Sequence, residues 1–193
     1  MRSFVVTVAA LALTVLTLQA NVVIPAEFRE IVRESTLIVR GRVTDVRSEV
    51  VPQRGVESIA TVAIESRMKG ESSSFTYVRL PGGEAGGRRV VTVGAPTLQP
   101  GQRAVFFLRP SGADSTMLLV GFTQGIYRVQ PEPMTGRAVV APPLVSGVTE
   151  GRSGPAVRGD SRRRLMSVPE FESLVKLVLA SSGTAAAPRG ASR

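Results

Sequence analysis

Cysteine, histidine and tryptophan are all absent from this sequence of 193 residues, and aromatic residues make up only 5% of it. Without cysteine or histidine, a chain cannot form a Ser-His-Asp triad, a cysteine nucleophile, an iron–sulfur site or a zinc site of the usual kind. Disulfides are excluded as well, so packing must hold the fold. Because aromatic residues are scarce, the core must come mainly from Val, Leu, Ile and Ala, a pool that favours β-strands. We therefore expect a non-catalytic, mainly β protein with no cofactor and no metal.

The first 20 residues have the layout of a secretory signal peptide. A positive charge at Arg2 precedes an apolar run over 4–18, and Ala20 follows as the residue before cleavage. The run has about 15 residues, fewer than the roughly 20 that a membrane-spanning helix needs. An uncleaved N-terminal anchor is the alternative. We predict a signal peptide over 1–20, export to the periplasm or the medium, and no stable membrane span after cleavage.

The net charge of +9 is unevenly distributed along the chain. Residues 21–150 contain 15 basic and 12 acidic residues, whereas residues 151–193 contain 8 basic and 3 acidic residues. Most of the basic excess therefore lies in the C-terminal part, where Arg162, Arg163 and Arg164 form a short run. Nearly all the basic residues are arginine, a bias that GC-rich codon usage produces as readily as selection for phosphate contacts does. Together with export, this distribution argues against a nucleic-acid partner.

The mature chain begins with a short helical pattern and continues with alternating ones. Phe28, Ile31 and Val32 lie at i, i+3 and i+4, which predicts one turn or two of surface helix. From Thr36 the period changes to two, and turn residues interrupt it at short intervals. This part, 21–141, is predicted to be a single β domain. The expected strands are 36–51, 59–68, 75–80, 88–93, 103–109, 117–122, 125–129 and 137–141.

Such strands, with no helix between them, predict a closed or nearly closed antiparallel barrel, and a sandwich is the alternative. Residues 103–109 are apolar on both faces and should form the most buried strand. Gly41 lies inside the first strand, where a bulge or bend is expected. The fold is thus predicted to be mainly β, with a short N-terminal helix and a C-terminal helix docked on the barrel.

The C-terminal part divides into three segments. Residues 142–166 are rich in Gly, Pro, Ser and Arg without apolar periodicity, so we predict an irregular linker. Ser167 and Glu170 have the spacing of a capping box, and an apolar stripe follows them, which predicts a helix over 167–181. Almost no apolar mass is left in 182–193, which is predicted to be a disordered tail.

Six short strings resemble a group of uncharacterised bacterial exported proteins and, more distantly, the netrin-like module of tissue inhibitors of metalloproteinases. The strings occupy 36–43, 68–70, 78–84, 93–96, 100–108 and 121–129. The resemblance implies a five-stranded OB-like barrel flanked by helices. Those inhibitors chelate the protease zinc through an N-terminal cysteine, whereas the mature chain here is expected to begin at Asn21 and contains no cysteine. The resemblance therefore implies the fold and does not supply the inhibitory residues.

A glycine-rich segment is the candidate binding site that we predict from the sequence. Gly82, Gly83 and Glu84 are followed closely by Arg88 and Arg89, so backbone N–H groups and two guanidinium groups could meet an anion there. No Gly-Lys-Ser/Thr follows and the next element is β-like, so the segment lacks the helix N-terminus of a P-loop. A hairpin or wide loop with local ion pairing is the plainer interpretation.

One nucleophilic scheme remains compatible with the composition, a Ser-Lys dyad of Lys69 with a serine among 72–74. A surface turn explains the same residues. We therefore predict an exported, non-catalytic binding or interaction module, whose partner is a protein or glycan of the cell envelope or the medium. A secreted protease inhibitor that acts through barrel-edge loops is the alternative.

Overall fold

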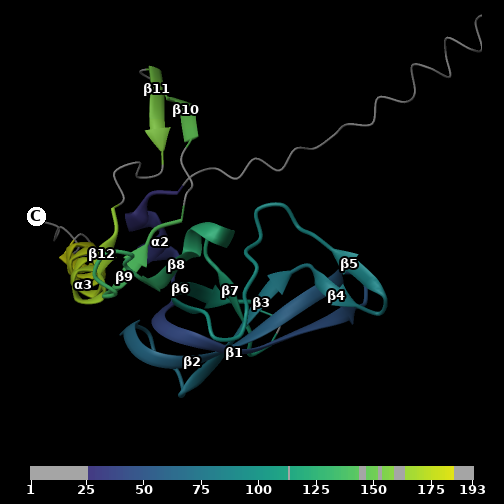
Figure 1. Ribbon diagram of the computed structural model, residues 1–193. Coiled ribbons are helices and arrows are strands. Elements are labelled where there is room, and N and C mark those ends of the chain that lie inside the picture. Colours follow the sequence, from purple (N-terminus) through teal and green to yellow (C-terminus); the bar gives the residue numbers. More distant parts are fainter. Residues whose placement is uncertain (1–25, 113, 144–146, 152–153, 159–163, 185–193) are drawn as a thin grey trace, which may run out of the picture.

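The computed structural model describes residues 26–112, 114–143, 147–151, 154–158 and 164–184 (Figure 1). The signal peptide predicted over 1–20 lies outside the described residues, as do residues 185–193 of the predicted tail. Among the described residues, no helix combines the length and the apolar character that crossing a membrane requires.

The protein is mainly β, and eight strands of its described part form one sheet (Figure 1). These strands are β1 (Leu37–Val51), β2 (Gly55–Lys69), β3 (Phe75–Pro81), β6 (Arg103–Pro110), β7 (Met117–Leu119), β8 (Ile126–Pro131), β9 (Ala138–Ala141) and β12 (Met166–Ser167). Their order in the sheet is β1-β2-β3-β7-β6-β8-β9-β12. Since β1 also pairs with β6, the pairings lead from β1 through β2, β3, β7 and β6 back to β1.

The prediction of a purely antiparallel arrangement is wrong at one place. β3 and β7 run parallel, with Val78 opposite Met117, so the sheet is mixed. The reason is the path of the chain, because β7 returns antiparallel to β6 after a short turn and so runs in the direction of β3 on its other side. The irregularity predicted at Gly41 is confirmed, since the β1–β2 register shifts between Arg40 and Gly41.

Strand β6 contributes to two apolar cores because its successive side chains point to opposite faces. Phe106 belongs to a core built mainly from β1, β2, β3 and β6. Phe107, the next residue, belongs to a second core that β6 and β8 share with the helices. Every side chain from Ala104 to Leu108 is buried, which confirms that this strand is apolar and covered on both faces.

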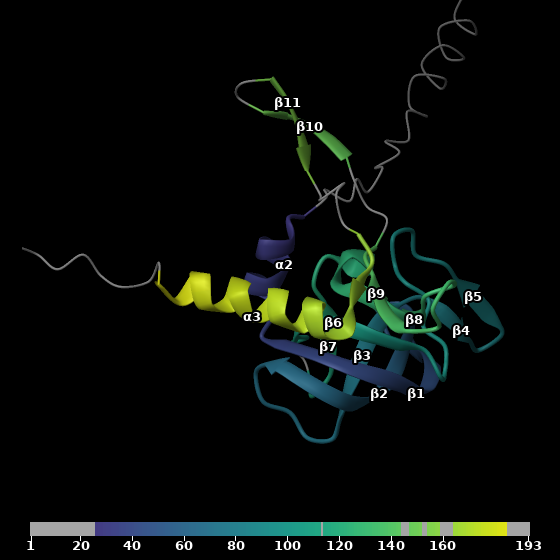
Figure 2. The ribbon, with the colours of Figure 1, turned by 60° about the vertical axis from the view of Figure 1, so that its left-hand side comes forward.

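Two helices, α2 (Phe28–Glu34) and α3 (Val168–Thr184), cover the second core. Figure 2 shows α3 lying along the sheet with α2 beside it. The capping box is confirmed, because the Ser167 N–H donates to Glu170 Oε2 at 2.9 Å and the Glu170 N–H donates back to Ser167 Oγ at 3.4 Å. The helix ends at Thr184, beyond the predicted end at residue 181.

An ion-pair cluster fastens α3 to the sheet. Arg40 on β1 contacts Glu172 on α3 at 3.2 Å and Glu65 on β2 at 3.0 Å. Arg103 on β6 contacts the other oxygen of Glu65 at 2.8 Å. The Glu65 carboxylate thus pairs with two guanidinium groups, and Arg40 links α3 to β1 and β2. The docking of the C-terminal helix predicted from its apolar stripe therefore has both an apolar and a polar component.

The linker predicted over 142–166 is not wholly irregular. It contains a hairpin of β10 (Gly147–Gly151) with β11 (Gly154–Arg158), and its last residue starts β12. The sequence hides this hairpin because the segment has no apolar alternation. In Figure 1 β10 and β11 stand apart from the main sheet, and their hydrogen-bonded partners are each other.

Two predicted strands are shorter than expected. The one predicted over 117–122 ends at Leu119, and a 3-10 turn, η1 (Phe122–Gly125), follows. Gly121 and Phe122 cause the break, since their φ angles of 65° and 55° lie in the left-handed region, where a strand cannot continue. The strand predicted over 88–93 ends at Val90.

Asp114 organises the turn between β6 and β7. Its Oδ1 accepts hydrogen bonds from the Thr116 N–H at 2.9 Å and from Ser111 Oγ at 2.9 Å, and its Oδ2 receives the buried guanidinium of Arg79. The hydrogen bond from the Thr116 hydroxyl is the largest of the effects that lower the pKa of Asp114 from 3.8 to about 2. The folded structure therefore stabilises the ionised form of Asp114 over the protonated form.

The substitution Asp114→Asn is expected to reveal this preference as a pH dependence. Because the folded pKa is depressed, the stabilisation is present above the unfolded pKa near 3.8 and is lost as the pH falls toward about 2. Urea unfolding of both proteins from pH 2 to pH 7 measures it. The difference in unfolding free energy should be constant above about pH 5 and shrink below about pH 4. A difference that does not change with pH would contradict the assignment.

Candidate functional site

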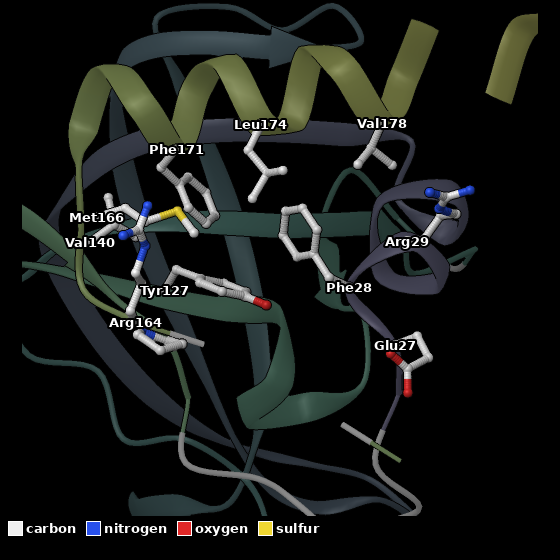
Figure 3. Close-up of a pocket in the computed structure, with 11 residues that line it drawn as sticks. Glu27, Phe28, Arg29, Tyr127, Val140, Arg164, Met166, Phe171, Leu174 and Val178 are labelled. Carbon is white, nitrogen blue, oxygen red and sulfur yellow. The ribbon is translucent and has the colours of Figure 1, made fainter. Parts of the chain in front are cut away.

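A pocket of about 290 Å³ lies between the two helices and the sheet (Figure 3). Its walls come from α2, α3, β8, β9 and the segment that enters β12. At the roughly 30 Å³ that a water molecule occupies in the liquid, the volume corresponds to about ten waters. The residues that line it are Glu27, Phe28, Arg29, Tyr127, Val140, Pro142, Arg164, Met166, Phe171, Leu174 and Val178.

Three aromatic rings from three separate elements meet at the pocket. The ring centroids of Phe28 and Tyr127 are 5.7 Å apart, those of Phe28 and Phe171 are also 5.7 Å apart, and those of Tyr127 and Phe171 are 5.0 Å apart. Phe107 supports them from the sheet, at 5.3 Å from Tyr127 and 5.9 Å from Phe28. The three pairs that include Phe28 are edge-to-face and the two other pairs are tilted, and such contacts are favourable. The apolar wall is therefore a packed aromatic cluster.

Local sequence rules explain why each ring points into this space. Phe28 lies on the apolar stripe of α2, and Phe171 lies in the first turn of α3, directly after the capping box. Tyr127 is on β8, on the face shared with Val129, and its side chain is 2% exposed. Figure 3 shows its hydroxyl directed toward the side of the pocket formed by Phe28 and Glu27. The phenol thus places one polar atom in a largely apolar wall.

Charged residues occupy the two ends of the pocket. In Figure 3 the guanidinium of Arg164 lies at one end, beside Met166, whereas Arg29 and Glu27 lie at the other end, beyond Phe28. The lining as a whole carries one acidic and two basic groups. Neither arginine forms an ion pair with another described residue.

Among the described residues, Glu170 is the acidic group nearest in sequence to Arg164, and the capping box already engages it. Both the N–H and the hydroxyl of Ser167 donate to Glu170 Oε2, at 2.9 and 2.8 Å. The hydroxyl hydrogen bond is the main reason that the pKa of Glu170 lies below its ordinary value, and the charge of Arg164 contributes least. The Glu170 carboxylate is therefore hydrogen-bonded at the N-terminus of α3.

The side chains that line this pocket are mainly apolar. Within the described ranges, no group of three or more acidic, histidine or cysteine residues is placed to hold a metal ion. The lining consists of aromatic and aliphatic side chains with one phenol and three charged groups near the ends. Such a surface removes apolar area from water and orients a polar end group, which are the two requirements of a small-molecule site.

The structure places the glycine-rich candidate site elsewhere, at the far end of the β1–β2 hairpin. β4 (Gly83–Ala85) and β5 (Arg88–Val90) form a hairpin there. Gly82, Gly83, Glu84 and Arg89 line one hollow of about 340 Å³, and Arg88 is outside that lining. The structure thus brings four of the five predicted residues together.

Packing accounts for both glycines of this hairpin. Ser58 Oγ donates to the Gly82 carbonyl at 2.7 Å, and it is 2.9 Å from Ser48 Oγ. Gly83, with φ of 136°, faces both serine hydroxyls so closely that a side chain could not fit. At Gly82, where φ is 91°, an added Cβ would lie 2.7 Å from the Val90 carbonyl oxygen. Packing of the two hairpins therefore requires both glycines, and their presence does not in itself point to a ligand.

Lys69 has a structural partner at the end of α2. Its Nζ donates to the carbonyls of Val32 and Arg33 at 2.9 and 3.2 Å. Burial lowers the pKa of Lys69. Ser73 Oγ donates to the Phe75 carbonyl at 2.8 Å. The lysine of the proposed Ser-Lys dyad thus satisfies carbonyls at a helix C-terminus, where a positive charge is favourable.

The pocket was not predicted as a site from the sequence. Phe28 lies in the N-terminal helical pattern, Phe171 lies within the helix predicted over 167–181, and Tyr127 lies in a predicted strand. Each of these patterns is typical of ordinary core packing. No local signal indicates that the three elements leave a space between them. The one usable hint was the presence of two one-sided helices around a single β domain, both of which must cover the same sheet.

Comparisons with known proteins give no indication of function. No model of a known protein family matches this chain, and a comparison with curated proteins found no match either. The resemblance to exported and netrin-like proteins accordingly rests on short strings of strand and turn residues. The function must be inferred from the residues that the fold brings together.

Proposed function

We propose that this protein is an exported, non-catalytic binding module that holds a small, largely apolar ligand in the pocket between α2, α3 and the sheet. The observation that carries the proposal is the pocket itself, lined by the aromatic cluster of Phe28, Tyr127 and Phe171. Export rests on the signal-peptide pattern of residues 1–20. The lack of cysteine and histidine supports a binding role over a catalytic one.

We further propose an OB-like barrel as the core of the module. The pairings that lead from β1 through β2, β3, β7 and β6 back to β1 support it, because five strands that return to the first are what a small closed barrel needs. The apolar residues enclosed by these strands are consistent with such an interior. On this view, the helices lie on the outside of the barrel, and the ligand pocket lies between helices and barrel.

The size of the pocket limits the ligand. A space equal to about ten water molecules accepts about ten non-hydrogen atoms. Small ligands gain at most about 1.5 kcal/mol per such atom and drug-sized ligands about 0.3. Ten atoms at about 0.5 kcal/mol each gain about 5 kcal/mol, which corresponds to a Kd of roughly 0.1–1 mM. Burial against aromatic and aliphatic side chains is the driving force, which predicts a negative heat-capacity change on binding.

Binding of 1-octanol tests the proposed function. Methyl NMR signals of Met166, Leu174 and Val178 should shift on titration, with a Kd near the range above. The substitution Leu174→Trp should weaken binding at least about tenfold, because the larger side chain projects into the space. Leu177→Trp is the matched control, since Leu177 lies on the same helix but is 68% exposed and outside the lining. If octanol leaves these signals unchanged, or if both tryptophan variants bind it equally, the proposal is wrong.

A further inference from the structure

We infer that the ligand of this pocket is a small monocarboxylate, with its apolar body against the aromatic cluster and its carboxylate at Arg164. The inference rests on the proposed function and adds the chemical class of the ligand. It depends on three observations: the apolar lining, the position of Arg164 at one end of that lining, and the engagement of the neighbouring acidic group by other partners.

The distribution of charge selects Arg164 over Arg29. Figure 3 places Glu27 and Arg29 at the same end of the pocket, so an anion there would face a carboxylate as well as a guanidinium. At the opposite end Arg164 lies beside Met166, and no acidic residue belongs to that part of the lining. Glu170, the described acidic residue nearest in sequence to Arg164, is outside the lining, and Ser167 donates two hydrogen bonds to its carboxylate. Of the two arginines in the lining, Arg164 is thus the one whose end of the lining contains no carboxylate.

The chemistry of guanidinium selects a carboxylate. Arginine presents parallel N–H donors that match the two oxygens of a carboxylate, and such charge-assisted pairs are stronger than neutral hydrogen bonds. The lining carries a net charge of one positive unit, which a monocarboxylate balances. A phosphate monoester would bring close to two negative charges and a larger, strongly hydrated head. An ammonium head would meet like charge at Arg164 and is disfavoured.

Three ligands with the same alkyl chain separate the contributions of body and head: octanoate, 1-octanol and octylammonium. Methyl NMR titrations at pH 7 and low salt give the three affinities with the full mature chain. Octanoate should bind about three- to tenfold more tightly than octanol, as expected for one partly exposed ion pair, and octylammonium should bind most weakly. Added salt to 0.5 M should reduce the advantage of octanoate and leave octanol unchanged, because screening acts on the charge pair alone.

The variants Arg164→Gln and Arg29→Gln identify the residue responsible. Both replace an exposed arginine at a pocket end by a neutral side chain of similar length. Arg164→Gln should abolish the preference for octanoate or reverse it, since the carboxylate then loses water without gaining a partner, and octanol affinity should fall by less than octanoate affinity does. Arg29→Gln should keep the preference.

The titrations distinguish failure of the carboxylate inference from failure of the proposed binding function. Equal binding of octanoate and octanol would overturn the carboxylate inference and leave the apolar pocket as a ligand site. Loss of the octanoate preference in Arg29→Gln instead of Arg164→Gln would overturn the assignment of the head group. Failure of all three ligands to shift the pocket methyl signals would overturn the proposed function itself.

Discussion

The substitution Phe107→Ala is expected to lower the free energy of unfolding by about 3–5 kcal/mol, the largest effect of any single change proposed for this protein. The ring of Phe107 is fully buried, and its centroid lies 5.3–6.4 Å from those of Phe28, Tyr127 and Phe171. Its removal deletes apolar contacts with all three and leaves a cavity that rigid neighbours cannot fill. Since domains of this size are typically stable by 5–15 kcal/mol, much of the stability would be lost.

Urea unfolding followed by circular dichroism measures this loss, and thermal unfolding should show a midpoint lower by roughly 10–20 °C. Phe75→Ala is the matched control, because it removes the same ring from a β-strand of the same sheet but from a side chain that is 44% exposed. Phe75 has one ring contact, with Tyr77 at 5.4 Å, so its removal should cost less than about 1.5 kcal/mol. Equal costs for the two variants would show that the Phe107 ring is not the centre of the second core.

Gly70→Ala should be the second most damaging substitution, with a cost of about 2–5 kcal/mol. Gly70 follows β2 with φ of 76°, a conformation in which a residue with a Cβ is strained. The added Cβ would also collide with the carbonyl oxygen of Thr36, directly before β1. Because the obstacle is backbone, relief requires the ends of β1 and β2 to separate, next to the helix end that Lys69 holds.

Gly87→Ala separates the two contributions to that cost. Gly87 has a similar φ of 69°, but a Cβ built there has no neighbour within 4 Å. This control should therefore show the conformational strain alone, about 1–2 kcal/mol. Urea unfolding of the two variants under the same conditions gives the comparison. If Gly70→Ala were no more destabilising than Gly87→Ala, the close approach to Thr36 would not contribute to stability.

Much of the secondary structure could be predicted because it depends on residues close together in the chain. The capping box of Ser167 and Glu170 spans a single turn, and the helix begins where the pattern indicates. The continuous apolar run in β6 predicted burial on both faces, which the structure confirms. The hairpin of β10 and β11 was not predicted, because its sequence lacks the local apolar alternation by which a strand is recognised.

The candidate site could not be predicted in this way. Three rings that are ordinary core residues by pattern become a pocket wall because α2, β8 and α3 converge. The glycine-rich segment looked like an anion cradle, yet the position of Gly83 against two serine hydroxyls is explained by packing. In both cases the function of a residue depends on neighbours that are remote in sequence.

Composition and local patterning establish two properties of this protein. A chain without cysteine or histidine cannot form a Ser-His-Asp triad, a cysteine nucleophile or a zinc site of the usual kind, and its alternating apolar residues require strands whatever their final arrangement. The packing of distant segments determines that β1 pairs with both β2 and β6, that β3 and β7 run parallel, and that two helices leave a pocket with Arg164 at one end. The two kinds of feature differ in the distance along the chain over which the underlying interactions act. Backbone periodicity and capping act over a few residues, whereas strand order and pockets depend on how distant segments fill one shared volume.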